Sequence, residues 1–191
     1  MQQLWDRIVK EGRVLPGNII KVDGFLNHKI DVKLSREMAK EFGRRFDLSG
    51  ITAVLTVEAS GIALGAICAD EWNVPLVFAK KAKSDNIEGG LYQSDIFSYT
   101  YKKHVKLLLS QQWLGKDDKV LIVDDFLANG EALRGLVEIV GQAGAKMIGI
   151  GIAVEKGFQP GGQKLRDAGY NLQSLAIIDK ADENGIVIRK V

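Results

Sequence analysis

The stretch that decides the fold of this chain reads VLIVDDFLANGEAL, from Val120 to Leu133. Its four consecutive apolar residues, 120–123, predict a strand buried on both faces, because strands inside a parallel sheet lack polar alternation. The strand runs into two adjacent carboxylates, Asp124 and Asp125, and then into a short loop with one glycine. The segment therefore predicts a strand, an acidic tip, a loop and a helix, in that order.

The helix is expected from apolar side chains at i, i+3, i+4 and i+7, which are Leu133, Leu136, Val137 and Val140. Gly144 follows where a C-cap glycine belongs. The first turn of such a helix presents unpaired backbone N–H groups and the positive end of its dipole to the loop at 128–132. The loop therefore suits a phosphate group.

Two carboxylates beside a phosphate loop are compatible if the ligand also brings hydroxyls or a divalent cation, as a phosphorylated sugar does. A simpler interpretation makes Asp124 and Asp125 solvated loop acids and Asn129-Gly130 an ordinary turn. The strand and the turn taken alone favour this simpler interpretation.

The whole pattern nevertheless resembles the phosphoribosyl diphosphate signature of the type I phosphoribosyltransferases. The resemblance implies that Asp124 and Asp125 are the catalytic pair, which hydrogen-bonds the ribose hydroxyls. It also implies that the 5′-phosphate is bound by Ala128, Asn129, Gly130, Glu131 and Ala132. The family loop usually carries Thr or Ser at the place of Asn129 and again near its end. Those hydroxyl contacts are lost here, although Asn129 can still donate to phosphate.

Two further segments match diphosphate-binding parts of the same family. A strand expected at 51–57 ends in Glu58-Ala59-Ser60-Gly61, and the resemblance assigns Ser60 and Gly61 to the loop that receives the leaving group. A tight turn with Ser60 as the helix N-cap is the alternative, and both roles are compatible. After a strand at 74–79, Lys81 and Lys83 match basic residues that bind diphosphate, often across a dimer interface; the alternative is a solvated basic rim.

The segment Phe25-Leu26-Asn27-His28 resembles the base-recognition hood of the xanthine-specific branch of this family. The resemblance implies that Ile20, Asn27 and Lys156 contact the base. An Asn amide offers a donor and an acceptor, and a Lys ammonium that donates to exocyclic carbonyls favours an oxo-purine over adenine. Without the resemblance, Asn27 is better interpreted as a turn residue bound to its own backbone, and Lys156 as a surface residue.

Composition excludes several other classes of protein. The chain has 191 residues, of which 46% are hydrophobic and 26% charged, and its formal net charge is +2. This charge is too small to indicate nucleic acid as a partner, and no basic block occurs. Residues 1–11 mix charges of both signs and do not resemble a signal peptide, and no apolar run is long enough to cross a bilayer. We expect a cytoplasmic location. Two histidines and one cysteine, Cys68, give no metal cluster.

Strands expected near residues 51, 74, 105, 120, 147 and 175, with helices after the first, fourth and fifth, predict an α/β fold with a mostly parallel sheet. We expect one domain over 1–191: a hood and N-terminal helices at 1–48, a core at 49–160, and C-terminal strands at 161–191 with a hairpin at Asn184-Gly185. The polar stretch 84–101 matches the position of the family's flexible lid. Ligands of such sheets bind at the carboxyl ends of the strands, where all the candidate loops lie.

The resemblance implies transfer of a phosphoribosyl group from phosphoribosyl diphosphate to xanthine, with Mg²⁺ bound together with the diphosphate and with a homodimer as the assembly. Guanine, hypoxanthine or adenine as the acceptor is the nearest alternative. A second alternative is a regulator that binds phosphoribosyl diphosphate without catalysis. Such regulators carry an added DNA-binding segment or a strongly basic face, and the N-terminal portion here is too short for one.

Overall fold

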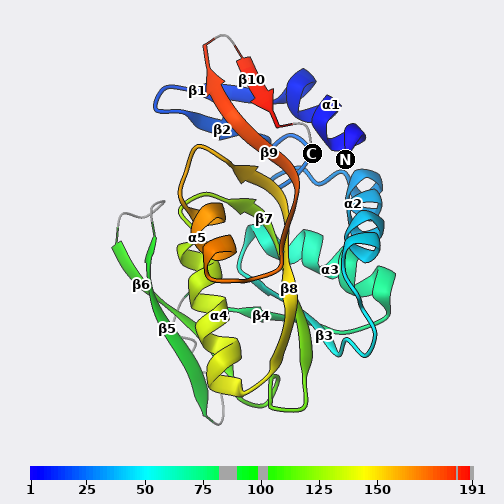
Figure 1. The fold of residues 1–191 in the computed structure, drawn as a ribbon, viewed down its shortest axis with the longest axis vertical. Helices are drawn as coiled ribbons and strands as arrows, with labels where there is room; N and C mark the ends of the chain where they lie inside the picture. The colour runs from blue at the N-terminus through cyan, green and yellow to red at the C-terminus, as the bar shows by residue number, and fades with distance from the viewer. Residues whose placement is uncertain (82–89, 99–102, 184, 190–191) are drawn as a thin grey trace.

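The computed structural model describes residues 1–81, 90–98, 103–183 and 185–189 (Figure 1). A six-stranded sheet in the order β10-β9-β8-β7-β3-β4 forms its centre. Its strands, in chain order, are β3 (Ala53–Val57), β4 (Leu76–Ala79), β7 (Lys119–Leu127), β8 (Lys146–Lys156), β9 (Leu172–Asp182) and β10 (Gly185–Ile188). Every neighbouring pair is parallel except β10 with β9. The mostly parallel sheet and the C-terminal hairpin are confirmed.

The signature strand β7 lies inside this sheet, between β3 and β8. Its four residues 120–123 are 0% exposed, as the unbroken apolar run predicts. The strand continues through Asp124 and Asp125 to Leu127, so both acids belong to the end of the strand rather than to a loop.

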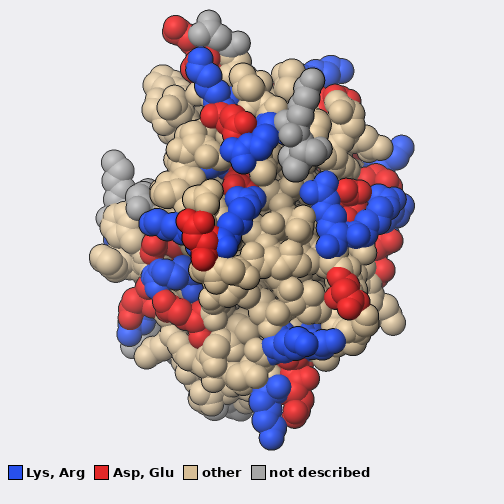
Figure 2. Space-filling model, in the orientation of Figure 1, with Lys and Arg blue, Asp and Glu red and all other residues tan. Residues whose placement is uncertain are grey.

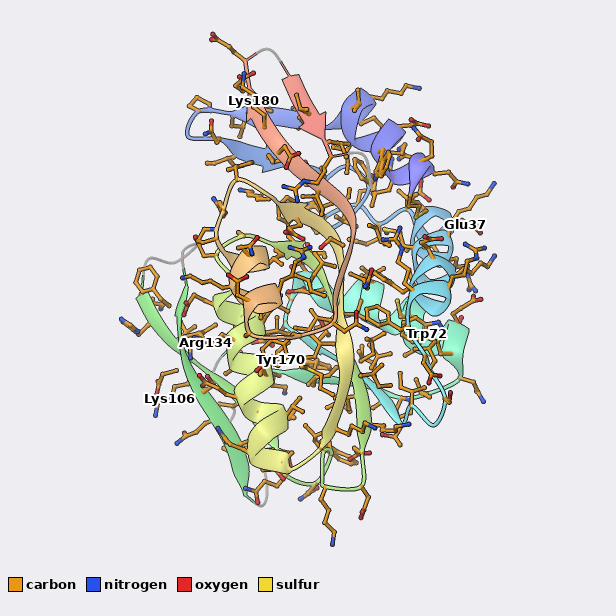
Figure 3. All side chains as sticks on the ribbon, in the orientation of Figure 1. Glu37, Trp72, Lys106, Arg134, Tyr170 and Lys180 are labelled. Atoms are coloured by element: carbon orange, nitrogen blue, oxygen red, sulfur yellow. The ribbon has the colours of Figure 1, made fainter. Side chains whose placement is uncertain are left out.

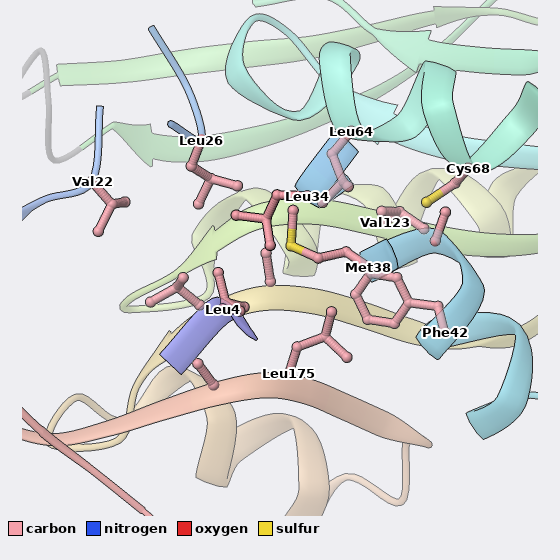
Figure 4. Packing of buried hydrophobic residues seen from close by; sticks show 14 of the residues in the cluster. Leu4, Val22, Leu26, Leu34, Met38, Phe42, Leu64, Cys68, Val123 and Leu175 are labelled. Carbon is pink, nitrogen blue, oxygen red and sulfur yellow. The ribbon is translucent and has the colours of Figure 1, made fainter. Parts of the chain in front are cut away.

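Helices cover both faces of the sheet, as expected for a doubly wound fold. On one face lie α1 (Gln2–Glu11), α2 (Val32–Arg45) and α3 (Ser60–Trp72). Figure 4 shows their core, in which α2 and α3 side chains such as Phe42 and Leu64 meet Val123 of β7. On the other face lie α4 (Glu131–Ala143) and α5 (Gly161–Asp167). The helix α4 ends at Gly144 with φ 67°, which confirms the expected C-cap.

The N-terminal helix α1 packs against β9, near the C-terminal end of the chain. Leu4 and Ile8 are 0% exposed and belong to the same core as Leu175 of β9. The indole Nε1–H of Trp5 donates to the carbonyl of Leu175 at 2.7 Å. A short hairpin, β1 (Arg13–Leu15) and β2 (Ile19–Lys21), follows α1, and its first strand was not expected from the sequence.

Two sequence predictions are wrong in this part of the fold. The strand expected near residue 105 is β6 (Lys103–Ser110), and it pairs antiparallel with β5 (Leu91–Ser98) in a separate hairpin instead of joining the main sheet. Residues 91–98, expected to be part of an irregular lid, are therefore a strand; residues 84–89 and 99–101 of the expected lid lie outside the described residues. The helix expected after the strand near residue 147 is α5 at residues 161–167, which lies within the segment expected as C-terminal strands.

The hairpin is held along one side of α4. Gln142 exchanges hydrogen bonds with the backbone of Gln93, at 3.1 and 2.7 Å, and Arg134 Nη2 donates to the carbonyl of Asp95 at 2.6 Å. Arg134 lies between α4 and the hairpin in Figure 3. A Cβ at Gly135 would lie 2.7 Å from Ile96, so α4 and β5 pack closely. Polar side chains two turns apart on α4 thus bind β5, a pairing that strand periodicity cannot reveal.

Basic and acidic side chains are interspersed over the face shown in Figure 2, in keeping with the small net charge. Among the described residues, no helix is long and apolar enough to cross a membrane.

Candidate active site

The candidate loops meet at the carboxyl ends of the central strands. A pocket there is lined by Lys81, Asp124 and the loop that follows β7, with β5 of the hairpin forming another wall through Ile96 and Phe97. All five residues of the predicted phosphate loop, 128–132, line this pocket. The structure therefore brings Lys81 and the phosphate loop to one site; Lys83 lies outside the described residues.

The phosphate loop is short because α4 begins earlier than expected. Gly130 has φ 84° and is the N-cap of α4, and its carbonyl accepts a hydrogen bond from the backbone N–H of Arg134 at 2.8 Å. Glu131 is therefore the first helical residue. Its carboxylate accepts from Arg134 Nη2 at 3.2 Å and from the backbone N–H of Phe97 at 3.4 Å. The N-terminal turn of α4 faces the pocket with the donor geometry that suits a phosphate.

The acid pair is buried, so the interpretation as solvated loop acids is wrong. Asp124 is 5% exposed and Asp125 is 2% exposed. Burial, and next the negative charge of Asp125, raises the pKa of Asp124 well above its usual range, while the charge of Lys81 acts in the opposite direction. The backbone N–H of Asp125 donates to Asp124 Oδ1 at 3.0 Å.

Asp125 joins two predicted site residues that lie far apart in the chain. Asn27 Nδ2 donates to Asp125 Oδ2 at 2.8 Å, and Ser60 Oγ donates to Asp125 Oδ1 at 2.8 Å. Asn27 therefore binds the acid pair and not its own backbone. The N-cap of α3 is Ala59, and Ser60 is the first helical residue, so the prediction of Ser60 as N-cap is wrong. The hood and the predicted diphosphate loop meet at one carboxylate.

The first turn of α3 leaves no room for a side chain at Gly61. The peptide bond between Glu58 and Ala59 is cis. A Cβ at Gly61 would lie 2.2 Å from Thr56 Oγ1 and 2.5 Å from Asp124 Oδ1. Glu58, which the sequence did not single out as a contact, accepts a 2.6 Å hydrogen bond from the backbone N–H of Lys81 through Oε1. This bond fixes the end of β4 beside the end of β3.

The predicted base contacts differ in their surroundings. Lys156 ends β8, and its Nζ lies 5.6 Å from the centre of the Phe126 ring. Burial lowers the pKa of this ammonium. The side chain of Ile20 is only 7% exposed and packs in the core between the sheet and α1 to α3. Ile20 is thus part of the packing under the hood, and its contact with a base stays a prediction.

A buried ion pair beside Lys156 was missed by sequence reasoning. Glu155 is 2% exposed, and both of its carboxylate oxygens accept from Arg166 of α5 at 2.7 Å. Ser174 Oγ also donates to this carboxylate. Burial alone would raise the pKa of Glu155, but the hydrogen bonds from Arg166 and Ser174 lower it. The only sequence signal was an acidic residue at the end of an apolar strand.

A parallel sheet that carries a buried acid pair, a phosphate-type loop and a lysine at its strand ends is the arrangement of a phosphoribosyl-transferring enzyme. The family model for the phosphoribosyl transferase domain matches residues 21–181, and the chain belongs to this family. The resemblance to type I phosphoribosyltransferases is thereby confirmed.

Within this family, the chain is similar to individual proteins over nearly its whole length. The chain is 52% identical to the xanthine phosphoribosyltransferase of Lachnoclostridium phytofermentans, over 98% of this chain and 97% of the relative. It is 49% identical to the xanthine phosphoribosyltransferase of Bifidobacterium adolescentis, over 98% of each chain. Among solved structures, adenine phosphoribosyltransferase from Giardia lamblia complexed with 9-deazaadenine matches with a TM-score of 0.74 and 24% identity, over 91% of this chain and 96% of that one. This last likeness concerns the fold alone.

Proposed function

We propose that this protein transfers the 5-phosphoribosyl group of phosphoribosyl diphosphate to N9 of xanthine, which yields xanthosine 5′-monophosphate and diphosphate. The observation that carries the proposal is the junction at Asp125, where the hood residue Asn27 and the diphosphate-loop residue Ser60 meet. About half-identical relatives of nearly the same length, all named xanthine phosphoribosyltransferases, support the choice of base.

In the proposed reaction the bond from ribose C1 to the diphosphate oxygen breaks, and a bond from C1 to purine N9 forms. The electron pair of the broken bond leaves with diphosphate, and the proton of the purine is released to solvent. The phosphate loop would hold the 5′-phosphate, while Asp124 and Asp125 would hold the ribose hydroxyls as positive charge develops on the sugar ring. Acceleration would come from positioning and electrostatic stabilisation.

The leaving diphosphate requires positive charge. Lys81 lines the pocket, and the hydrogen bond from its backbone N–H to Glu58 lies beside the end of β3. We propose that Lys81, together with Lys83, binds the diphosphate, and that Ser60 and Gly61 approach it from the start of α3. Mg²⁺ would accompany phosphoribosyl diphosphate and supply further positive charge; the hard carboxylate oxygens of Asp124 and Asp125 fit such an ion.

The choice of an oxo-purine is supported by the orientation of the Asn27 amide. Because Nδ2 donates to the acceptor-only carboxylate of Asp125, Oδ1 of Asn27 remains as a hydrogen-bond acceptor. An acceptor from Asn27 and a donor from Lys156 together match a ring N–H beside a carbonyl. Xanthine presents such an edge, whereas the corresponding edge of adenine carries an amino group beside an unprotonated nitrogen.

We further propose a homodimer, a cytoplasmic location, and one domain divided into a hood at 1–48, a core at 49–160 and a C-terminal part at 161–191. The basic segment that begins at Lys80 would lie near the dimer interface. Light scattering of the purified protein tests the dimer directly, and a monomer at the concentrations of the activity assay would contradict it.

The test of the proposed function is an assay with phosphoribosyl diphosphate and Mg²⁺ in which xanthine, guanine, hypoxanthine and adenine are each supplied separately. Diphosphate and nucleotide are both measured, so that hydrolysis of the sugar donor is distinguished from transfer. We expect the highest kcat/KM with xanthine. Preference for another purine would overturn the base assignment, and binding of the sugar donor without turnover of any purine would favour a regulator.

A further inference from the structure

The base-side lysine and the phosphate loop are joined by α5. Leu127, which precedes the phosphate loop, is the register partner of Glu155, which precedes Lys156. The chain then leaves β8, turns through residues 157–160 and enters α5 at Gly161. The residues on both sides of the site are therefore adjacent in the sheet, and α5 packs at their ends.

The first residue of α5 lies directly against the phosphate loop. The backbone N–H of Gly161 donates to the carbonyl of Ala128 at 3.1 Å. A Cβ at Gly161 would lie 2.3 Å from this carbonyl oxygen and 2.8 Å from the backbone nitrogen of Gly130. The two backbones thus touch without any side chain between them, so a displacement of α5 must displace the phosphate loop.

A salt bridge between Arg166 and Glu155 joins the other end of α5 to β8. The two parallel hydrogen bonds of 2.7 Å fix both the distance and the orientation of the guanidinium, as a single contact would not. Gly162 lies so close to the same carboxylate that a Cβ there would be 1.9 Å from Glu155 Oε1. Glu155 and Arg166 therefore set the position of the whole short helix.

We propose that Glu155 and Arg166 are positioning residues that hold α5 as a fixed spacer, so that the phosphate loop and Lys156 stay at the separation required by a bound nucleotide. Neither side chain touches substrate in this proposal. The inference rests on the proposed function, because it takes Lys156 as the base contact and 128–132 as the phosphate loop.

The proposal makes a specific prediction about two ligands. Xanthosine 5′-monophosphate spans the base side and the phosphate loop, whereas ribose 5-phosphate occupies the phosphate loop alone. In Arg166→Lys, and in the double variant Glu155→Gln/Arg166→Met, we expect the affinity for the nucleotide to fall about tenfold or more, because a misplaced binding group loses much of its contribution. The affinity for ribose 5-phosphate should change less than about twofold.

Isothermal titration of both ligands into each folded variant measures the ratio of the nucleotide affinity to the ribose 5-phosphate affinity. Thermal unfolding of each variant measures its stability. The double variant leaves no unpaired buried charge, which keeps the test usable if Arg166→Met alone fails to fold. Arg44→Met, at an exposed arginine of α2, is the matched control, and its affinity ratio should equal that of the wild type. Arg166→Lys should lose less nucleotide affinity than the double variant, because it retains the positive charge.

Three outcomes oppose the proposal in distinguishable ways. A lower melting temperature with both affinities unchanged would make the ion pair purely structural. An equal loss of both ligands would indicate local damage to the phosphate loop. Failure of the wild-type protein to bind xanthosine 5′-monophosphate while it binds ribose 5-phosphate would overturn the proposed base specificity, and this inference with it.

Discussion

Asn27 and Asp125 are 98 positions apart in the chain, and the amide Nδ2 of the first donates to the carboxylate Oδ2 of the second at 2.8 Å. This bond connects an exposed residue of the hood to a buried residue of the central strand. Because a carboxylate only accepts, it determines which end of the Asn27 amide is directed away from it. The proposed specificity for the base thus depends on the hydrogen bond between Asn27 and Asp125.

Replacing Asn27 by Asp should place two carboxylates in contact. We expect kcat/KM for xanthine to fall by about 30-fold or more, which corresponds to a loss of about 2 kcal/mol from one charge-assisted hydrogen bond and the added repulsion. Repulsion favours the protonated form of the introduced carboxyl, so the deficit should shrink as the pH is lowered. A pH profile of kcat/KM measures this, with Asn27→Ala as the uncharged control. A deficit that is independent of pH would contradict the explanation.

Replacing Asp125 by Asn should lower turnover without unfolding the protein. The substitution keeps the volume of the side chain but directs an NH₂ group toward one of its two donors, Asn27 or Ser60. We expect kcat to fall by about 30-fold to 150-fold, corresponding to about 2–3 kcal/mol for a lost charged hydrogen bond to the ribose. Steady-state kinetics and circular dichroism together test this role. Wild-type turnover in a folded variant would exclude it.

Asp124 should make the protein less stable as the pH rises. Burial raises the folded-state pKa above the unfolded value, so the folded state binds more protons in the window between the two values. The stabilisation is complete below the unfolded pKa and is lost as the pH rises through the folded pKa. Asp124→Asn should therefore be more stable than the wild type near neutral pH, and the difference should narrow toward pH 4. Urea unfolding across this range measures the difference, and parallel curves at all pH values would contradict it.

Gly61→Ala should be destabilising, because its Cβ would lie 2.2 Å from Thr56 Oγ1 and 2.5 Å from Asp124 Oδ1. We expect a loss of about 1–3 kcal/mol, as for other overpacked interiors, together with weaker binding of phosphoribosyl diphosphate. Gly141→Ala in α4 is the matched control, since a Cβ there would meet no atom within 4 Å outside the neighbouring backbone of its own helix. It should be neutral or stabilising by up to about 1 kcal/mol through helix propensity. Equal stabilities of the two variants would refute the steric argument.

The sequence predicts the parts of the site that are local. The strand, the acid pair, the loop and the helix from Val120 to Gly144 follow from spacing and capping within one short segment, and the structure has them in that order. The observed end of β7 lies a few residues beyond the predicted one, because the polar pair Asp124 and Asp125 stays within the strand instead of ending it. Burial of a carboxylate depends on partners supplied by other segments, so it cannot be predicted from the acid itself.

The missed features are contacts between distant segments. The hairpin β5–β6 packs on α4 through polar helix side chains such as Gln142. Residues 84–101 have no apolar periodicity from which this packing could be predicted. The bidentate pair of Glu155 with Arg166 likewise joins the end of β8 to α5, and strand or helix periodicity does not predict such a pairing. The side chain of Ile20 is buried in the core, and its expected contact with the base stays a prediction.

The bond from the Trp5 indole to the carbonyl of Leu175 has a consequence for biosynthesis. Leu175 is synthesised only after nearly all of the chain has been translated. Until then α1 lacks this hydrogen-bond partner, whereas the central strands β3, β7 and β8 can already pair. The phosphate-binding half of the molecule can thus form on the ribosome before the base-binding half is closed. Nascent chains released before residue 175 would be expected to keep α1 accessible to protease.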